Sequence, residues 1–237
     1  MLFHFFSSMK TSLFIFVLLN DNLEQQAQTI FEYYFINNDY EIKENTNLGS
    51  VCRCLLGGTP SRTKTEYWNG NIAWINSGEV NRFRIISPTE YITKEGLNCS
   101  TTKLLPAKTT VLAITGATLG QVSLLEIDSC TNQSVVGIVP NTEIPYEFIY
   151  PFIKSNIREL VLHQTGGAQQ HINKQNIESI KILIPNDKIL KEYINVVSPM
   201  YSTISNNCFE SNSLIELRDS LLSKLMSGEI DVSNIDL

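Results

Sequence analysis

Apolar residues recur at helical spacing near both ends of the chain and in short runs between them. From Phe16 to Tyr34 they follow steps of three and four, which predicts a helix with one buried face. A second series begins after Asp187, and its alternation of fours and threes, apart from a gap at Ser211, predicts a long helix with a coiled-coil seam. The two series are Phe16, Leu19, Leu23, Ala27, Ile30 and Tyr34, then Leu190, Ile194, Val197, Tyr201, Ile204, Cys208 and Ile215.

The second helix is expected to be long and irregular. Pro199 lies inside its pattern, so we expect a kink or a break there, and Gly228 should end the helix before a polar tail. A continuous helix of about 40 residues would reach about 60 Å, which is more than the core of a domain of this size requires. We therefore expect the helix to reach a partner. Toward its end the seam shifts register at Leu214, Leu217, Leu221 and Leu225.

The middle of the chain contains six short β-branched and apolar runs between turn signals, and these runs predict strands. They read SVCRCLLGG, NIAWINSG, TTVLAITGATLG, QVSLLEIDS, SVVGIVPN and IKILIPND. One helix is predicted in PYEFIYPFIKSNIRELVLHQTGG, where Gly166 and Gly167 should mark its end. The predicted fold class is α+β, a globular mixed-sheet domain flanked by long helices that form a coiled-coil arm. The expected boundaries are 1–46 for an N-terminal helical segment, 47–185 for the domain, and 186–237 for the C-terminal long helix and tail.

Composition and cysteine usage are those of a globular protein with free thiols. The 237 residues are 43% hydrophobic and 18% charged. The five cysteines are odd in number and mostly far apart, unlike the paired cysteines of small secreted domains, so we expect reduced thiols in a cytoplasmic protein. Cys52 and Cys54 would share one face of a strand, but a structural zinc site needs a second pair. Zinc binding is therefore the less favoured interpretation.

The first twenty residues resemble the start of a signal peptide, because Lys10 precedes an apolar run. No small-residue cleavage site follows this run, and the run is too short to span a bilayer. The helical pattern is therefore the favoured interpretation. Residues 1–18 otherwise have no assigned role.

Motifs for catalysis are missing from the sequence. It contains no phosphate-binding G-x-x-x-x-G-K-[ST] loop, no G-x-S-x-G elbow, no H-E-x-x-H pair and no G-x-G-x-x-G dinucleotide motif. The Asp/Asn-Pro-Pro-aromatic tetrapeptide of amino-methylating enzymes is also missing. His4, His163 and His171 do not form a catalytic set. We therefore expect a chain that is not catalytic by itself and that holds no metal or cofactor.

Cationic and aromatic residues gather between residues 57 and 84, in GGTPSRTKTEYWNGNIAWINSGEV and the segment that follows. Arg and Lys suit phosphates and guanine edges, and Asn suits adenine edges, so this mixture is typical of a nucleic-acid surface. A solvated rim around a core tryptophan would give the same mixture, and both interpretations stay open. The residues are Arg62, Lys64, Arg82 and Arg84, with Trp68, Trp74, Asn76 and Asn81.

The net charge of −6 is unevenly distributed. Residues 48–185 carry 12 Lys and Arg against 10 Asp and Glu, and within them residues 53–108 carry 8 against 4. The flanking segments carry 6 against 14. The acidic excess therefore lies on the helical arms, and the basic bias of the middle permits DNA binding without demonstrating it.

Five segments follow one another along the chain: LGGTPSRTKTEYWNGNIAWINSGEV, TGATLG, TNQSVVGIVP, TGGAQQHINKQNIESIKILIP and LRDSLLSKLMSGEI. In this order they resemble the specificity subunit of type I restriction-modification systems, and LNDNLEQQAQTIFEYYF is similar to the helix that leads into a recognition domain of that family. The resemblance covers nearly everything after residue 18. It implies that the middle of the chain is a target-recognition domain for double-stranded DNA.

The resemblance also implies partners. A full subunit of this family has two recognition domains joined by two long antiparallel helices, and this chain carries one domain, so it resembles a half-subunit or a fragment. Two copies that pair their arms about a two-fold axis would read a bipartite palindrome. Methyltransferase subunits would supply S-adenosylmethionine chemistry on adenine. A restriction subunit would supply ATP-driven translocation and cleavage with magnesium.

The resemblance places DNA-facing loops at GGTPSRTK and WINSGEV, with Gly57 and Gly58 forming a tight turn and Trp74 as either a contact or a core anchor. The positions Gly116, Gly120, Asn132, Gln133 and Asn173 match family motifs and are expected to shape turns. The candidate DNA-binding residues are Thr59, Ser61, Arg62, Lys64, Trp74, Asn76, Arg82, Arg84, Gln169 and Gln170.

Three alternatives remain. The domain could be a protein-interaction adaptor that the helices oligomerise, and salt-dependent affinity for duplex DNA would distinguish it from a DNA reader. A stand-alone nuclease or hydrolase would need a carboxylate or histidine cluster that the sequence does not assemble. A silent or truncated specificity cassette would encode no autonomous DNA recognition.

Overall fold

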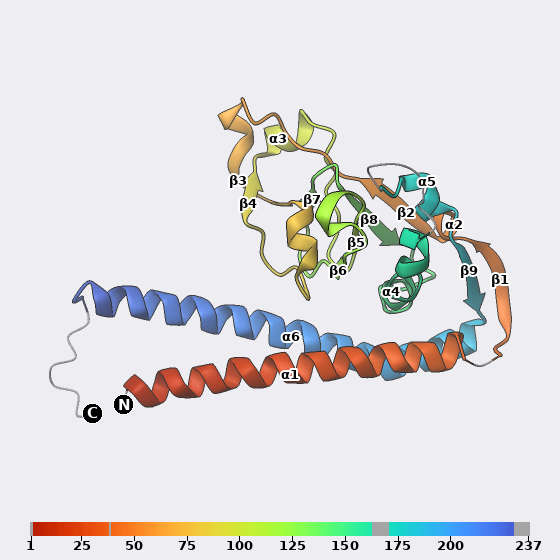
Figure 1. The fold of residues 1–237 in the computed structure, drawn as a ribbon, viewed down its shortest axis with the longest axis horizontal. Coiled ribbons are helices and arrows are strands. Elements are labelled where there is room, and N and C mark those ends of the chain that lie inside the picture. Colours follow the sequence, from red (N-terminus) through yellow and green to blue (C-terminus); the bar gives the residue numbers. More distant parts are fainter. Residues whose placement is uncertain (1, 38, 163–170, 230–237) are drawn as a thin grey trace. The chain divides into compact units, whose positions relative to one another are not determined.

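Two long helices connect the two units of the computed structural model, which describes residues 2–37, 39–162 and 171–229. One unit, called the helical unit, comprises residues 1–29 and 196–237. The other, called the globular unit, comprises residues 30–195. Helix α1 (Leu2–Phe35) and helix α6 (Asp187–Met226) each pass from one unit into the other (Figure 1).

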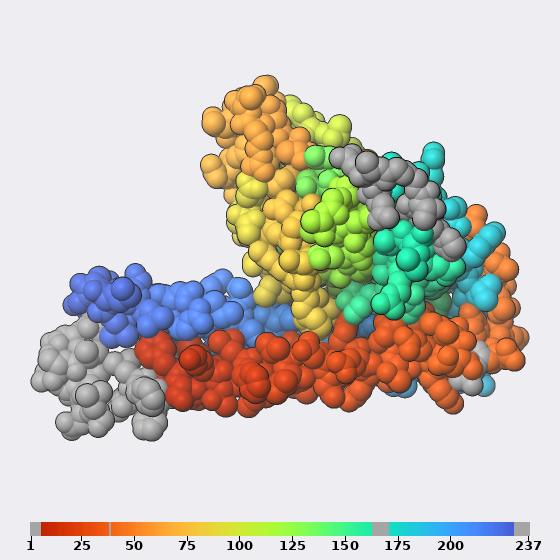
Figure 2. All heavy atoms as spheres, viewed as in Figure 1, coloured from red at the N-terminus to blue at the C-terminus, as the bar shows by residue number. Residues whose placement is uncertain are grey.

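In the helical unit, the first part of α1 and the later part of α6 lie side by side (Figures 1 and 2). The predicted buried face of α1 is confirmed at Ala27, but Leu19 is 41% exposed and the neighbouring Asn20 is buried in its place. The amide of Asn207 donates to Asn20 Oδ1 at 2.8 Å, and Asn20 Nδ2 lies 3.6 Å from the sulfur of Cys208. A polar layer therefore occupies the seam where the apolar pattern predicted a leucine.

Helix α6 runs through Pro199 without interruption, so of the expected kink or break the break is wrong, and the kink stays a prediction. Pro199 has no N–H to donate to the backbone carbonyl four residues before it. Because Pro199 is exposed, water can donate a hydrogen bond to that carbonyl instead. The predicted end is confirmed, because Gly228 adopts a φ of 73° and its N–H donates to Leu225 O at 3.3 Å. The predicted seam is buried at Leu190, Val197, Tyr201, Ile204 and Cys208. Ile215 and Leu217 are exposed.

The globular unit contains three small sheets, and the predicted α+β class with a mixed sheet is confirmed. All strand pairs are antiparallel except β3 with β7, within the described residues. The first sheet has the order β2 (Cys52–Leu56), β8 (Val135–Pro140), β5 (Thr110–Ala113) and β6 (Val122–Leu124). The second has the order β4 (Glu90–Ile92), β3 (Trp68–Ile75) and β7 (Cys130–Thr131), and the third pairs β1 (Ile42–Asn47) with β9 (Lys181–Pro185).

Helix α4 (Tyr146–Leu162) confirms the helix predicted in the middle of the chain, while Gly166 and Gly167 lie outside the described residues. All six predicted strand runs contain a strand. Strand β1 was not predicted, because its sequence IKENTN is polar and largely exposed and gains its order from pairing with β9. The short helices are α2 (Leu48–Val51), α3 (Lys94–Asn98), α5 (Lys174–Glu178) and the 3-10 turns η1 (Thr65–Tyr67), η2 (Ser77–Asn81) and η3 (Gly116–Thr118).

Buried aliphatic side chains from the first sheet, the end of β3 and neighbouring loops form a hydrophobic core cluster of the globular unit, among them Ile75, Ile85, Val111 and Val135. Cys52 and Cys54 lie on one face of β2, as predicted, and burial raises the pKa of each thiol to about 12. In the described part of the chain, no group of three or more His, Cys, Asp or Glu side chains is placed to hold a metal ion. Across the same residues, no helix has the length and apolar content to cross a membrane.

The buried amide pair of the helical unit gives a stability prediction. Replacing Asn20 with Ala leaves the amide of Asn207 buried without its partner, so we expect a loss of about 1 to 3 kcal/mol in the free energy of unfolding, measured by urea denaturation. The double variant Asn20→Leu/Asn207→Leu should recover most of that loss, because both polar groups are removed together. Additive losses in the double variant would contradict a coupled pair.

Candidate nucleic-acid interface

Trp74 anchors the glycine-rich turn to the core. Its side chain is buried, at 2% exposure for the residue, and its indole N–H donates to Gly58 O at 3.0 Å. Of the two roles expected for Trp74, the structure therefore gives the core anchor, and this burial corrects its place among the candidate DNA contacts. Gly57 and Gly58 are required by close approach: a Cβ on Gly57 would lie 2.2 Å from the carbonyl oxygen of Asn132.

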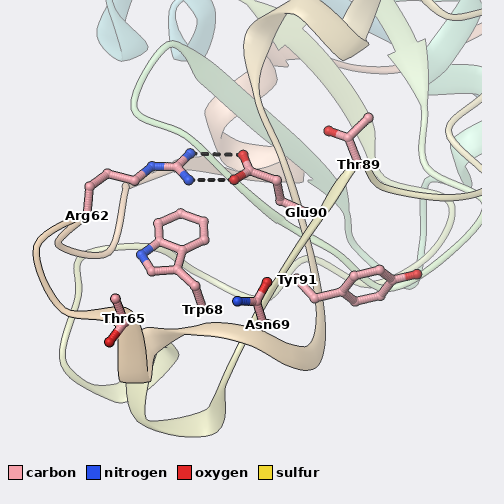
Figure 3. A pocket seen from close by; sticks show the side chains of 7 residues that line it. All are labelled: Arg62, Thr65, Trp68, Asn69, Thr89, Glu90 and Tyr91. Atoms are coloured by element: carbon pink, nitrogen blue, oxygen red, sulfur yellow. Dashed lines mark hydrogen bonds and ion pairs between the residues drawn. The ribbon is translucent and has the colours of Figure 1, made fainter.

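The chain leading into β3 lies at one end of the globular unit (Figure 1). An open pocket of about 340 Å³ lies in this part of the unit. The pocket lies between the η1 turn, the start of β3 and strand β4. Figure 3 shows its side chains, with the Arg62 guanidinium and the Glu90 carboxylate facing each other beside the indole of Trp68. The lining residues are Arg62, Thr65, Trp68, Asn69, Thr89, Glu90 and Tyr91.

Arg62 is held by two different contacts. Its Nη1 and Nη2 donate to the two carboxylate oxygens of Glu90 at 2.5 and 2.9 Å. Its guanidinium carbon also lies 3.7 Å from the centre of the Trp68 ring, which is within cation–π range. Trp68 is itself fixed, because its indole N–H donates to Ser61 O at 3.1 Å and its ring packs edge-on against Trp74. The guanidinium therefore has a defined plane and direction.

The Arg62–Glu90 pair remains open to solvent, with side-chain exposures of 52% and 34%. The hydrogen bond from Arg62 holds the pKa of the Glu90 carboxyl below its usual range, and the bond to Glu90 raises the pKa of Arg62. An ion pair with this exposure stabilises a fold by at most about 1 kcal/mol. The pair is therefore available to a ligand at low cost to the fold.

The neighbouring candidates line the same turn. Lys64 is exposed and donates from Nζ to the phenol oxygen of Tyr67 at 2.9 Å, and this hydrogen bond raises the pKa of Lys64. The hydroxyl of Thr59 lies 2.6 Å from Oε1 of Gln133, and that of Ser61 lies 2.9 Å from the hydroxyl of Thr63. Lys64 and Ser61 thus flank Arg62 on an exposed loop.

The second predicted DNA-facing loop, WINSGEV, is organised by its own internal hydrogen bonds. Asn76 caps the η2 turn, because its side chain accepts from the N–H of Gly78 at 2.8 Å and contacts Glu79. Arg82 donates to Ser87 O at 2.7 Å and lies 3.2 Å from the carboxylate of the buried Glu79. Asn76 and Arg82 therefore shape this loop, and their contact with a ligand stays a prediction.

Arg84 does not lie at the surface, which corrects its place among the candidate DNA contacts. Its side chain is 1% exposed, it donates to the phenol oxygen of Tyr150 at 3.0 Å, and its Nε lies 3.5 Å from a carboxylate oxygen of Glu126. Lys108 contacts the other oxygen of Glu126. The charge of Arg84 is thus used within the core.

The remaining candidates behave as turn formers or lie outside the described residues. Gly116 and Gly120 have φ values of 71° and 83°, which confirms that they shape a turn. Asn132 accepts from the N–H of Ser134 at 3.0 Å, and Asn173 caps α5, so these two predictions are also confirmed. Gln169 and Gln170 lie outside the described residues.

Glu90, Asn69 and Tyr91 were not predicted as site residues. Glu90 is 28 positions from Arg62, and no local pattern indicates that an acidic residue will pair with that arginine. Asn69 adopts a φ of 60°, and the Asn-Gly dipeptide was the available signal, because this pair favours left-handed turns. The pocket therefore depends on contacts between segments that sequence spacing does not show.

Comparison with known proteins points to the same family as the sequence resemblance. Residues 17–217 match the family described as the type I restriction modification DNA specificity domain. The chain is 30% identical over 169 residues to the specificity subunit of the type I restriction enzyme EcoR124I/EcoR124II of Escherichia coli, covering 69% of this chain and 42% of that subunit. It is 28% identical over 197 residues to the HindI specificity subunit of Haemophilus influenzae, covering 81% of this chain and 42% of that subunit.

A solved structure has a similar fold. The S subunit of a type I restriction-modification system from M. genitalium matches with a TM-score of 0.64 and 16% identity, over 92% of this chain and 58% of that one. The chain thus spans about half of that structure and 42% of the length of the two curated relatives.

The two arginines of this region should differ sharply in their effect on stability. Arg84→Ala leaves Glu126 buried with an incomplete set of partners, so we expect a loss of about 3 to 5 kcal/mol in the free energy of unfolding. Arg62→Ala, the matched control, removes an exposed pair and should cost about 1 kcal/mol or less. Urea denaturation of both variants measures the difference, and equal losses would contradict the assignment of Arg84 to the core.

Proposed function

The chain belongs to the family of type I restriction modification DNA specificity domains, and we propose that it acts as the non-catalytic component that directs adenine methylation and restriction to a bipartite DNA site. The pocket around Arg62 is the observation that carries this proposal. It combines an oriented guanidinium, an indole and an exposed amide on a turn that Trp74 anchors to the core. These are the groups that proteins use against phosphates and base edges.

Within this proposal, the DNA-binding surface is the loop that contains Thr59, Ser61, Arg62 and Lys64. The exposed Lys64 supplies a positive charge for the phosphate backbone, whose neutralisation provides much of the affinity for DNA. Asn76, Arg82, Gln169 and Gln170 are kept as secondary candidates. Trp74 and Arg84 are excluded as contacts because they are buried.

The helical unit is proposed to hold the partners. Large apolar side chains remain exposed along α1, at Phe14, Ile15, Val17 and Leu18, and they offer a face that a further helix pair could cover. We propose that this face pairs with a second copy or with another specificity half. Methyltransferase subunits with S-adenosylmethionine, and a restriction subunit that uses ATP and magnesium, would complete the complex.

The DNA sequence at which the complex methylates adenine tests the proposal. The chain is co-expressed with the methyltransferase subunit of its own system in a host without adenine methylation, and modified adenines are mapped by single-molecule sequencing. We expect a new bipartite palindromic motif, because two identical recognition domains would be placed about a two-fold axis. The methyltransferase subunit expressed alone is the control.

Other outcomes separate the alternatives. An asymmetric motif would mean that a different specificity half had joined the complex. A complex that assembles but methylates at no motif, and whose affinity for duplex DNA does not fall with salt, would contradict DNA recognition and favour a protein-interaction adaptor or a silent or truncated cassette.

A further inference from the structure

We propose that Arg62 reads the edge of one guanine in the DNA half-site and that Glu90 is the residue that positions it for this role. The inference rests on the proposed function, because it assigns a specificity-determining pair within that DNA-binding surface. Glu90 was not among the candidate residues predicted from the sequence. Its position in the pocket, paired with Arg62, identifies it.

The donors of Arg62 are only partly used. Glu90 takes one hydrogen bond from Nη1 and one from Nη2, and among the described residues no partner accepts from Nε. A guanidinium carries five N–H donors in a fixed fork, so the Nε side can still make two parallel hydrogen bonds. The O6 and N7 atoms of guanine form the matching pair of acceptors in the major groove.

Glu90 is held in place by the sheet and not by the loop. It pairs with Trp74 across β3 and β4, and Trp74 is buried and bonded to Gly58. The carboxylate therefore projects from a fixed backbone position toward Arg62. Trp68 supports the guanidinium from its face, so rotation out of this plane is opposed by both neighbours (Figure 3).

The charge of the pair favours a base over a phosphate. The Glu90 carboxylate offsets the charge of Arg62 and would repel a phosphate that approached the same fork. Lys64 nearby is hydrogen-bonded to a neutral phenol and keeps its full charge for the backbone. The loop thus separates two tasks, with Lys64 for affinity and the Arg62–Glu90 pair for sequence.

The test combines motif mapping with binding of the purified complex to duplexes that carry the mapped site or a scrambled one. Arg62→Lys keeps the charge but loses the fork, so discrimination at one guanine of each half-site should fall roughly tenfold or more, with nonspecific affinity nearly unchanged. Glu90→Gln should lower discrimination at the same guanine and raise nonspecific affinity several-fold, because it removes a negative charge from the surface.

Two controls match these variants. Glu178→Gln removes a carboxylate of nearly the same exposure, 35% against 34% for Glu90, from another ion pair, and Lys43→Ala removes a cation from the β1–β9 sheet. Both should leave the motif and the discrimination at every base unchanged. Thermal unfolding of all variants confirms that each is folded.

The outcomes distinguish the inference from the proposed function. A wild-type complex with no motif would overturn the proposed function itself. A wild-type motif that Arg62→Lys and Glu90→Gln both leave unchanged would overturn only the inference, as would an equal loss of affinity for the mapped and scrambled duplexes in Arg62→Lys. Relaxed specificity at a single guanine in both variants would support it.

Discussion

The buried charge cluster around Arg84 is the interaction on which the globular unit depends. Arg84 and Glu126 are each 1% exposed in their side chains, and Lys108 and Tyr150 complete the cluster. These residues come from the loop after η2, from the segments that flank β5 and β6, and from α4, so the cluster connects parts of the chain that are distant in sequence. A buried charge that loses its partner lowers the free energy of unfolding by on the order of 3 to 5 kcal/mol. The folded state therefore keeps these segments together.

The cluster and the buried Trp74 together explain how the loops of the globular unit form a defined surface. Backbone hydrogen bonds between Ile85 and Leu124, and between Glu126 and Ile85, tie the loop after η2 to β6. On the other side, Trp74 holds the turn at Gly58. Arg62 therefore projects from a loop whose base is fixed, which is what recognition of a base edge requires.

Apolar periodicity was enough to predict the long helices and the six main strands, because burial of one face determines those elements. It failed where polar residues are buried or ordered by partners. Asn20 enters the seam through its bond with Asn207, and β1 is ordered by pairing with β9. For the candidate site, Arg62 was named from the sequence and lines the pocket. The sequence could not show that Arg84 is buried or that Glu90 pairs with Arg62, since both depend on contacts between distant segments.

The claim that the Arg62 surface meets DNA is tested most directly by amide hydrogen exchange of the full complex with and without a duplex that carries the mapped site. The account predicts slower exchange in residues 59–70 and 89–92, with no change for the same complex and a scrambled duplex at high salt. Protection confined to α1 and α6, or no difference between the two duplexes, would contradict it.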